Sequence, residues 1–247
     1  MAVPHRWIEA MRAGEALVLA QVDGLADDDL ARPSRLPGWD RAHVVGHLAR
    51  NADALGNLLA WARTGIPTPM YPSADARAGG IEESARQGPA ALRADVGAAS
   101  ARLVAAVGAL PEAAWDGEIR TNSGRRVTGA EVPWMRVRET WVHAVDLGTG
   151  VTFDDVLPEV VDALVDEVAG GLAGRDDCPA ATLTATDRPG TWSVGPAGIG
   201  ATAVGGDGLA VSGRRADLCA WLLGRDDGSR LDSSAPDGRA PALPRWL

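Results

Sequence analysis

The spacing of apolar residues predicts that the first part of the chain is helical. Residues 4–25 carry apolar side chains three and four positions apart, the pattern of a helix with one buried face. Similar patterns begin near residues 40, 81 and 131. Asp40 is a strong N-cap candidate, and Trp39 and Val44 fit a hydrophobic staple around it. We therefore expect four helices in a bundle over residues 1–150, with a long surface loop at residues 64–80.

The pattern changes after residue 150. Residues 154–171 predict another amphipathic helix, and four short runs of β type follow: ATLTATD, GTWSVG, GIGATAVGG and LAVSG. Gly, Pro and Asp turns separate these runs, and ADLCAWLLG predicts a final helix. The sequence thus predicts a small α+β domain over residues 151–247, after a short hairpin near residues 121–127 in the first part.

Composition and charge narrow the function classes. The 247 residues carry a formal net charge of −9, which argues against nucleic acid or an anionic membrane as the main partner. No apolar run is long enough to cross a bilayer and the N-terminus does not resemble a signal peptide, so we expect a cytoplasmic protein. Cys178 and Cys219 form no metal or redox spacing. We expect a monomer.

Two pairs of polar residues at helical spacing carry the candidate chemistry. His43 and His47 are one turn apart in the second helix, and Glu139 and His143 are one turn apart in the fourth. Catalytic zinc takes three such ligands and keeps an open position, a requirement that His47, Glu139 and His143 would meet if the two helices face each other. Spacing alone does not choose between His43 and His47. It also leaves open that both are structural histidines and that Glu139 pairs with a neighbouring arginine.

Three segments in order, LPGWDRAHVVGHLARNADAL, MYPSADARAGGIEESA and PWMRVRETWVHAVDL, closely resemble the mycothiol-dependent maleylpyruvate isomerases. That family belongs to the wider DinB-like group of thiol-dependent metal enzymes. The resemblance covers nearly the whole chain and is weaker over the C-terminal part, with its helix ending in WLLGR. It implies a DinB-like four-helix bundle followed by a small α/β domain.

The resemblance also implies a site. It makes His47, Glu139 and His143 ligands of zinc or another divalent metal, and His43 a neighbour of that site. The essential arginine of the second domain corresponds to Arg225, although three other arginines are near: Arg214, Arg215 and Arg230.

The implied reaction uses a nucleophile from outside the chain. The sequence contains no GxSxG or CxxC motif, and the thiol cofactor mycothiol would supply a metal-activated thiolate. This thiolate would add to the double bond of maleylpyruvate, and rotation and elimination would give fumarylpyruvate. The substrate is a dianion, so Arg225 is the first candidate to bind it and Arg77 a second. Asn51 is a further binding candidate, or else a satisfied buried amide.

Two alternatives remain open. The same site would serve a mycothiol S-transferase that conjugates another electrophile. A non-catalytic ligand-binding protein built on the bundle is the alternative from a different class. It predicts that the three candidate ligands are far apart or hold no metal.

Overall fold

The structure is a computed structural model that describes residues 3–196 and 208–246. Contacts divide the chain into two units, Met1–Val151 and Thr152–Leu247. Each unit has its own buried core, and each is described by itself below. Within the described ranges, none of the helices is both long enough and apolar enough to span a membrane.

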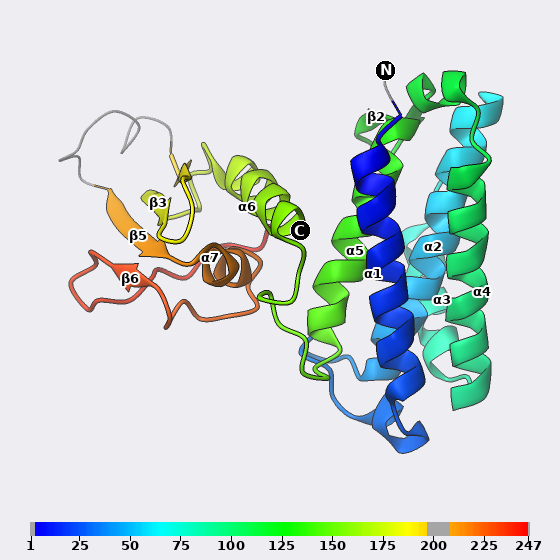
Figure 1. Ribbon diagram of the computed structural model, residues 1–247, viewed down its shortest axis with the longest axis horizontal. Coiled ribbons are helices and arrows are strands. Elements are labelled where there is room, and N and C mark those ends of the chain that lie inside the picture. The colour runs from blue at the N-terminus through cyan, green and yellow to red at the C-terminus, as the bar shows by residue number, and fades with distance from the viewer. Residues whose placement is uncertain (1–2, 197–207, 247) are drawn as a thin grey trace. The chain divides into compact units, whose positions relative to one another are not determined.

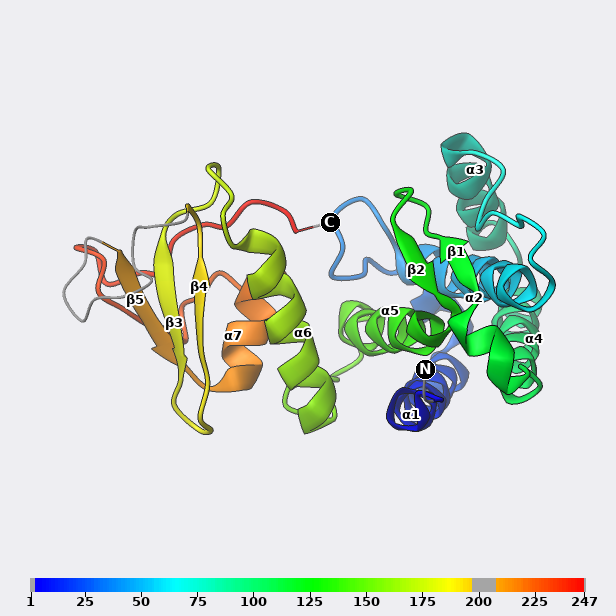
Figure 2. The same cartoon turned by 90° about the horizontal axis from the view of Figure 1, so that it is seen from above.

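Four long helices form the bundle of the first unit. They are α1 (His5–Gly24), α2 (Arg41–Thr64), α4 (Pro89–Gly108) and α5 (Val132–Asp146). Helix α1 packs against α4 and α5, and α2 packs against the same two helices, which closes the bundle (Figures 1 and 2). The core includes a row of fully buried leucines on α2, among them Leu48, Leu55 and Leu58.

Local signals explain where the site-bearing helices begin. The carboxylate of Asp40 accepts a hydrogen bond from the backbone N–H of His43 at 2.9 Å, which confirms the predicted cap of α2. Gly65 ends this helix with a φ of 72°, a conformation that favours glycine. Helix α5 carries Pro133 in its first turn, where a missing N–H has no cost. A short 3₁₀ turn, η3 (Gly129–Glu131), leads into it.

The predicted loop and third helix need correction. Residues 74–80 are helical, because α3 (Ala74–Ala85) begins inside the expected loop, where Ser73 accepts a hydrogen bond from the N–H of Ala76 at 3.0 Å. Residues 81–110 are not one helix, since the chain turns between α3 and α4. Helix α3 is stabilised by close packing on α2: a Cβ at Gly46 would lie 2.8 Å from the Cβ of Ser84. The described residues of the first unit, 3–151, therefore form five α-helices, and α3 lies outside the bundle (Figure 2).

Two 3₁₀ turns and a hairpin complete the first unit. The turn η1 (Asp27–Ala31) follows α1, and η2 (Glu112–Asp116) follows α4. Strands β1 (Glu118–Arg120) and β2 (Arg126–Thr128) pair antiparallel, as the predicted hairpin requires. Gly124 has a φ of 81° in the connecting turn.

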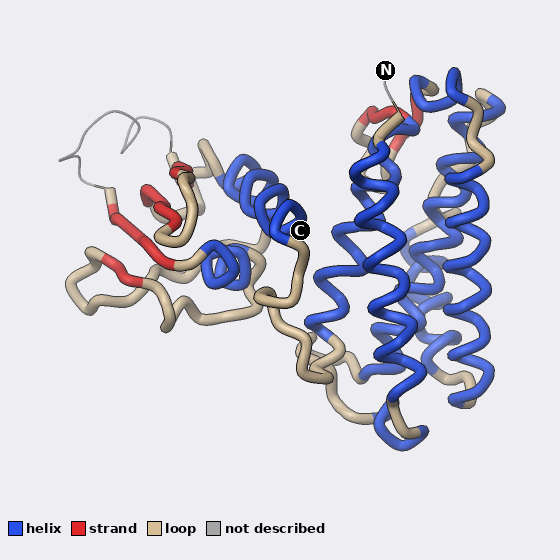
Figure 3. The backbone as a smooth tube through the Cα atoms, in the orientation of Figure 1, coloured by secondary structure: helices blue, strands red, loops and turns tan. Residues whose placement is uncertain are grey.

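Over residues 152–196 and 208–246, the second unit is a small mixed sheet covered by two helices. Its sheet has the order β4-β3-β5-β6, in which β3 and β5 are parallel and the outer pairs are antiparallel. The strands are β3 (Ala181–Ala185), β4 (Thr191–Val194), β5 (Leu209–Gly213) and β6 (Asp232–Ser233). Helices α6 (Pro158–Leu172) and α7 (Arg215–Leu222) pack on each other and on the sheet (Figures 2 and 3).

This arrangement confirms the expected small α/β domain. Three of the four predicted runs contain β3, β4 and β5. The fourth run, at residues 198–206, lies outside the described residues. The two-residue strand β6 was not predicted, because it lies in a polar tail without alternation of apolar side chains.

Candidate metal centre

Helices α2 and α5 bring three potential ligands together. His47 Nε2 lies 2.9 Å from Glu139 Oε2, and His143 Nε2 lies 3.4 Å from the same oxygen. One ligand atom from each residue falls within 4.8 Å of the others. The two imidazole rings meet edge to face with centroids 4.8 Å apart. Both ε nitrogens are therefore directed toward one carboxylate oxygen.

Burial and mutual contacts set the charge states of this triad. Burial lowers the pKa of His47, although its hydrogen bond with Glu139 acts in the opposite direction. Burial alone would raise the pKa of Glu139, but the hydrogen bonds with His143 and His47 hold it well below its ordinary value. Burial likewise opposes protonation of His143, but its hydrogen bonds with Asp146 and Glu139 raise its pKa to about 9. Without a metal, the triad holds a carboxylate against a protonated His143.

Asp146 orients one of the potential ligands. Its Oδ2 lies 2.9 Å from His143 Nδ1, and the aspartate side chain is fully buried. A carboxylate on one ring nitrogen fixes the other nitrogen toward a metal and makes it a stronger ligand. The sequence contains the signal, since Asp146 follows His143 by three residues, one helical turn. Asp146 therefore lies on the same face of α5 as His143, and its role follows from this contact.

His43 is held apart from the triad. Its Nδ1 lies 2.7 Å from Asp40 Oδ1, and its Nε2 lies 3.4 Å from Glu82 Oε1 on α3. Trp39 stacks on His43 at 6.2 Å between centroids, and the same indole lies 5.6 Å from the ring of His47. Among the described residues, the converging group contains His47 and not His43. The geometry thus separates two histidines that spacing could not.

The candidate binding residue Asn51 contacts a buried arginine. Its Oδ1 accepts a hydrogen bond from Arg136 Nη1 at 2.8 Å, and Arg136 pairs with Glu15 of α1. This contact favours the alternative in which the amide of Asn51 is satisfied within the protein. Arg136 forms its ion pair with Glu15, so this arginine is not the one that neutralises Glu139.

Arg77 of α3 lies in the electrostatic environment of the triad. Its charge contributes to the lowering of the pKa of His47, after burial and the interactions with His143. Its guanidinium carbon lies 5.8 Å from the ring centroid of Tyr71, a cation–π contact. Burial raises the pKa of Tyr71, with opposing contributions from Arg77. Within the described ranges, no ion pair joins Arg77 to a carboxylate. Sequence reasoning missed Tyr71, the one tyrosine of the chain.

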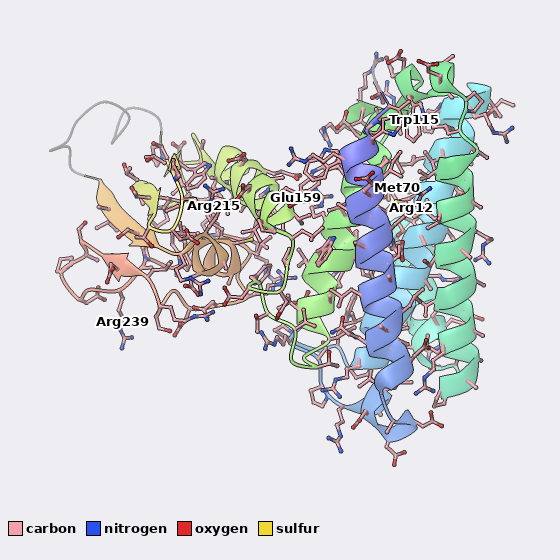
Figure 4. All side chains as sticks on the ribbon, in the orientation of Figure 1. Arg12, Met70, Trp115, Glu159, Arg215 and Arg239 are labelled. Carbon is pink, nitrogen blue, oxygen red and sulfur yellow. The ribbon has the colours of Figure 1, made fainter. Side chains whose placement is uncertain are left out.

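Arg225 belongs to the second unit, just beyond α7. Its Nη1 donates to the carbonyl of Leu223 at 2.7 Å. The three neighbouring arginines interact with aspartates of their own unit. Arg214 pairs with Asp154, Arg230 with Asp217 and Asp226, and Arg215 (labelled in Figure 4) with Asp162.

The residues of the triad fit a divalent metal. Two imidazoles and one carboxylate are the donor set of many catalytic zinc sites, and such sites keep a further position for an external ligand. Of the two ring nitrogens of His47, Nε2 faces Glu139 and is the one available to a metal at the triad, whereas Nδ1 is buried without a hydrogen-bond partner among the described residues.

The fold and the triad together define a DinB-like helical-bundle protein with a candidate metal centre. Residues 11–148 match the family model described as the mycothiol maleylpyruvate isomerase N-terminal domain. The chain belongs to this family, which confirms the resemblance found in the sequence.

Solved structures and curated relatives agree with this membership. The chain is 33% identical to a protein described as mycothiol-dependent maleylpyruvate isomerase, with a TM-score of 0.87 over the whole of both chains. A second structure, a histidine-to-alanine variant under the same description, gives 32% and 0.86. An uncharacterized protein of Mycobacterium tuberculosis is 27% identical over 262 residues, covering 100% of this chain and 95% of its own.

A more distant structure shares the fold alone. YfiT from Bacillus subtilis is described as a probable metal-dependent hydrolase with an unusual four-helix bundle topology. It is 18% identical, with a TM-score of 0.50 over 59% of this chain and 83% of its own.

Proposed function

We propose that this protein is a mycothiol-dependent maleylpyruvate isomerase, which converts maleylpyruvate to fumarylpyruvate in the cytoplasm. One observation carries the proposal. Two histidines and a glutamate converge within 4.8 Å in a fold that matches a protein of that description over the whole of both chains. Two free, buried cysteines agree with a reducing compartment.

The triad is the proposed metal site. His47 and His143 would bind through Nε2 and Glu139 through its carboxylate, with zinc as the first candidate ion. When bound, the metal supplies a Lewis acid that keeps a thiol in its thiolate form at neutral pH. His143 must release its proton to become a ligand, and Asp146 keeps Nδ1 of that ring protonated and Nε2 free for the site.

The reaction needs no net transfer of protons or electrons. A bound thiol would supply a nucleophile for reversible addition to the double bond of maleylpyruvate, which would permit rotation about that carbon–carbon bond, and the same thiolate would leave, so that no atom is gained or lost. The substrate, maleylpyruvate, carries two carboxylates, and the protein must bind them while the substrate changes its geometry. Arg77 is suited to bind one of them, because it is near the triad and Tyr71 contacts its guanidinium. Arg225 is the proposed catalytic arginine of the second unit.

A direct assay tests the proposal. Purified protein loaded with zinc and supplied with mycothiol should convert maleylpyruvate, seen as loss of its ultraviolet absorbance. His47→Ala and His143→Ala should lose both zinc and activity. His43→Ala is the matched control for zinc content, since it removes a histidine of the same helix that lies outside the triad.

The outcomes separate the alternatives. No turnover by protein that holds zinc at the triad would contradict the isomerase and direct the search to other electrophiles that an S-transferase would conjugate. Zinc content that is unchanged in His47→Ala and His143→Ala would contradict the metal site itself and favour a non-catalytic protein.

A further inference from the structure

We propose that Glu15, Arg136 and Asn51 form a positioning network that sets the register of the two ligand-bearing helices. Helix α1, which supplies no ligand, would thereby control the metal affinity of the triad. The inference rests on the proposed metal site and adds a role for three residues that do not touch the metal.

The network joins three helices through one guanidinium. Arg136 donates from Nε to Glu15 Oε1 at 2.6 Å and from Nη2 to Glu15 Oε2 at 3.1 Å. From Nη1 it donates to the carbonyl of Leu48 at 2.9 Å and to Asn51 Oδ1 at 2.8 Å. The planar guanidinium makes these contacts only in one orientation, so α1 and α2 are both fixed relative to α5.

The contacts lie one helical turn or less from the ligands. Arg136 precedes Glu139 by three residues on α5. On α2, Leu48 is the residue after His47, and Asn51 follows one turn later. A slip of one residue would shift either helix by about 1.5 Å and rotate it by about 100°. Such a slip would separate ligand atoms that now lie within 4.8 Å of one another.

Burial makes the network specific. The Arg136 side chain is fully buried, and Glu15 and Asn51 are each 4% exposed. A bundle with a different register would leave a buried guanidinium without its acceptors, which is a severe cost. By contrast, a purely apolar contact between the same helices would tolerate small shifts. The buried charges therefore exclude the alternative registers in which the triad is not assembled.

Close packing of α1 on α5 supports this network. Gly14, next to Glu15, faces Thr140, next to Glu139, and a Cβ at Gly14 would overlap the Thr140 hydroxyl. One position further along α5, the indole N–H of Trp141 donates to the carbonyl of Ala10 at 3.0 Å. Helix α1 thus lies directly against the turn of α5 that carries Glu139.

The inference separates metal affinity from stability. Replacing a buried ion pair by apolar residues of similar size is often neutral or stabilising, because the cost of burying the charges also disappears. The double variant Glu15→Met/Arg136→Met should therefore fold, with a Tm lowered mainly because the buried Asn51 Oδ1 loses its donor. Its Kd for zinc should nevertheless rise about 10- to 100-fold, the usual effect of losing support around metal ligands. The visible spectrum of bound cobalt should also change with the ligand geometry.

Two single variants carry the test if the double variant does not fold. Arg136→Lys keeps the positive charge but loses the paired guanidinium hydrogen bonds to Glu15. Asn51→Ala removes one acceptor of Arg136. Each variant should weaken zinc binding less than the double variant does. Val107→Ala, in the core on the last turn of α4, is the control for general destabilisation. It should lower Tm and leave the zinc Kd unchanged.

The result that overturns the inference is specific. It is a wild-type protein that binds zinc through the triad, together with folded network variants whose zinc Kd and cobalt spectrum equal those of the wild type. A wild-type protein that binds no zinc at the triad would instead overturn the proposed metal site, and the network role with it.

Discussion

Replacing Asp146 by asparagine removes one buried charge beside a proposed ligand and preserves the side-chain shape. Asp146 Oδ2 lies 2.9 Å from His143 Nδ1 and is shielded completely from solvent. Its interaction with the ring is therefore not screened as a surface pair would be. Loss of such a partner weakens metal binding about 10- to 100-fold, or about 1.4 to 2.7 kcal/mol. We expect the zinc Kd of Asp146→Asn to rise by this amount.

The same variant should change how the metal-free protein responds to pH. The pKa of His143 in the folded protein is about 9, above its ordinary value of 6.5, despite the opposing effect of burial. Protonated His143 therefore stabilises the fold fully below about pH 6.5, and this contribution, at most about 3 kcal/mol, is lost as pH rises through 9. Asp146→Asn should reduce the difference, because it replaces the charged hydrogen bond that contributes most to raising this pKa by a neutral one.

Two measurements and one control variant test the role of Asp146. Zinc affinity is measured by competition with a chromophoric chelator, and the free energy of unfolding by urea titration of metal-free protein at pH 6.5 and 9. Asp40→Asn is the matched control, because Asp40 makes the same contact with His43, which is outside the triad. Asparagine also caps a helix as well as aspartate does. Equal zinc affinity in the wild type and both variants would refute the role given to Asp146.

Three further predictions concern other parts of the chain. Arg77→Met should reduce kcat/KM for maleylpyruvate about 10- to 100-fold, through loss of a charged hydrogen bond, with zinc content unchanged; equal kcat/KM would exclude Arg77 from substrate binding. Cys178 and Cys219, each at most 2% exposed and each with a pKa raised by burial, should react with a thiol reagent only after denaturation. Rapid reaction of the native protein would contradict their burial. Gly14→Ala should destabilise the bundle by about 1 to 3 kcal/mol, because its Cβ would overlap a side chain of α5. Gly97→Ala on α4, where a Cβ meets nothing within 4 Å, should stabilise it by about 0.5 to 1 kcal/mol, and similar Tm shifts in both variants would contradict the packing argument.

Local signals predicted the elements that carry the site. The Asp40 cap, the proline in the first turn of α5 and the apolar spacing of both helices are all encoded within a few residues. The prediction of a loop at residues 74–80 was wrong because the local sequence there lacks such apolar spacing. The sequence of α3, ADARAGGIEESA, contains only one large apolar residue, Ile81, and its packing depends on the close approach of Gly46 to Ser84, a residue far along the chain. Sequence periodicity does not report a contact of that kind.

The site was predictable to the extent that its residues share a helix. Glu139 and His143 are neighbours because they are one turn apart, and any helix would bring them together. The choice between His43 and His47 depended on the family resemblance, because both lie on one stripe of α2. The structural difference between them comes from α3, where Glu82 approaches His43, and from α5, where Glu139 approaches His47.

The distance between His47 and Glu139 along the chain determines when the triad can form during synthesis. His47 and Glu139 are separated by 92 residues. At translation rates of about 5 to 20 residues per second, α5 leaves the ribosome roughly 5 to 20 seconds after the start of α2. During that interval Glu15, His47 and Asn51 have no partner on α5. Metal capture by the proposed site is therefore a late event in the synthesis of the chain, after three of the four bundle helices have been made, because an ion that arrives earlier finds only one of the three proposed ligands.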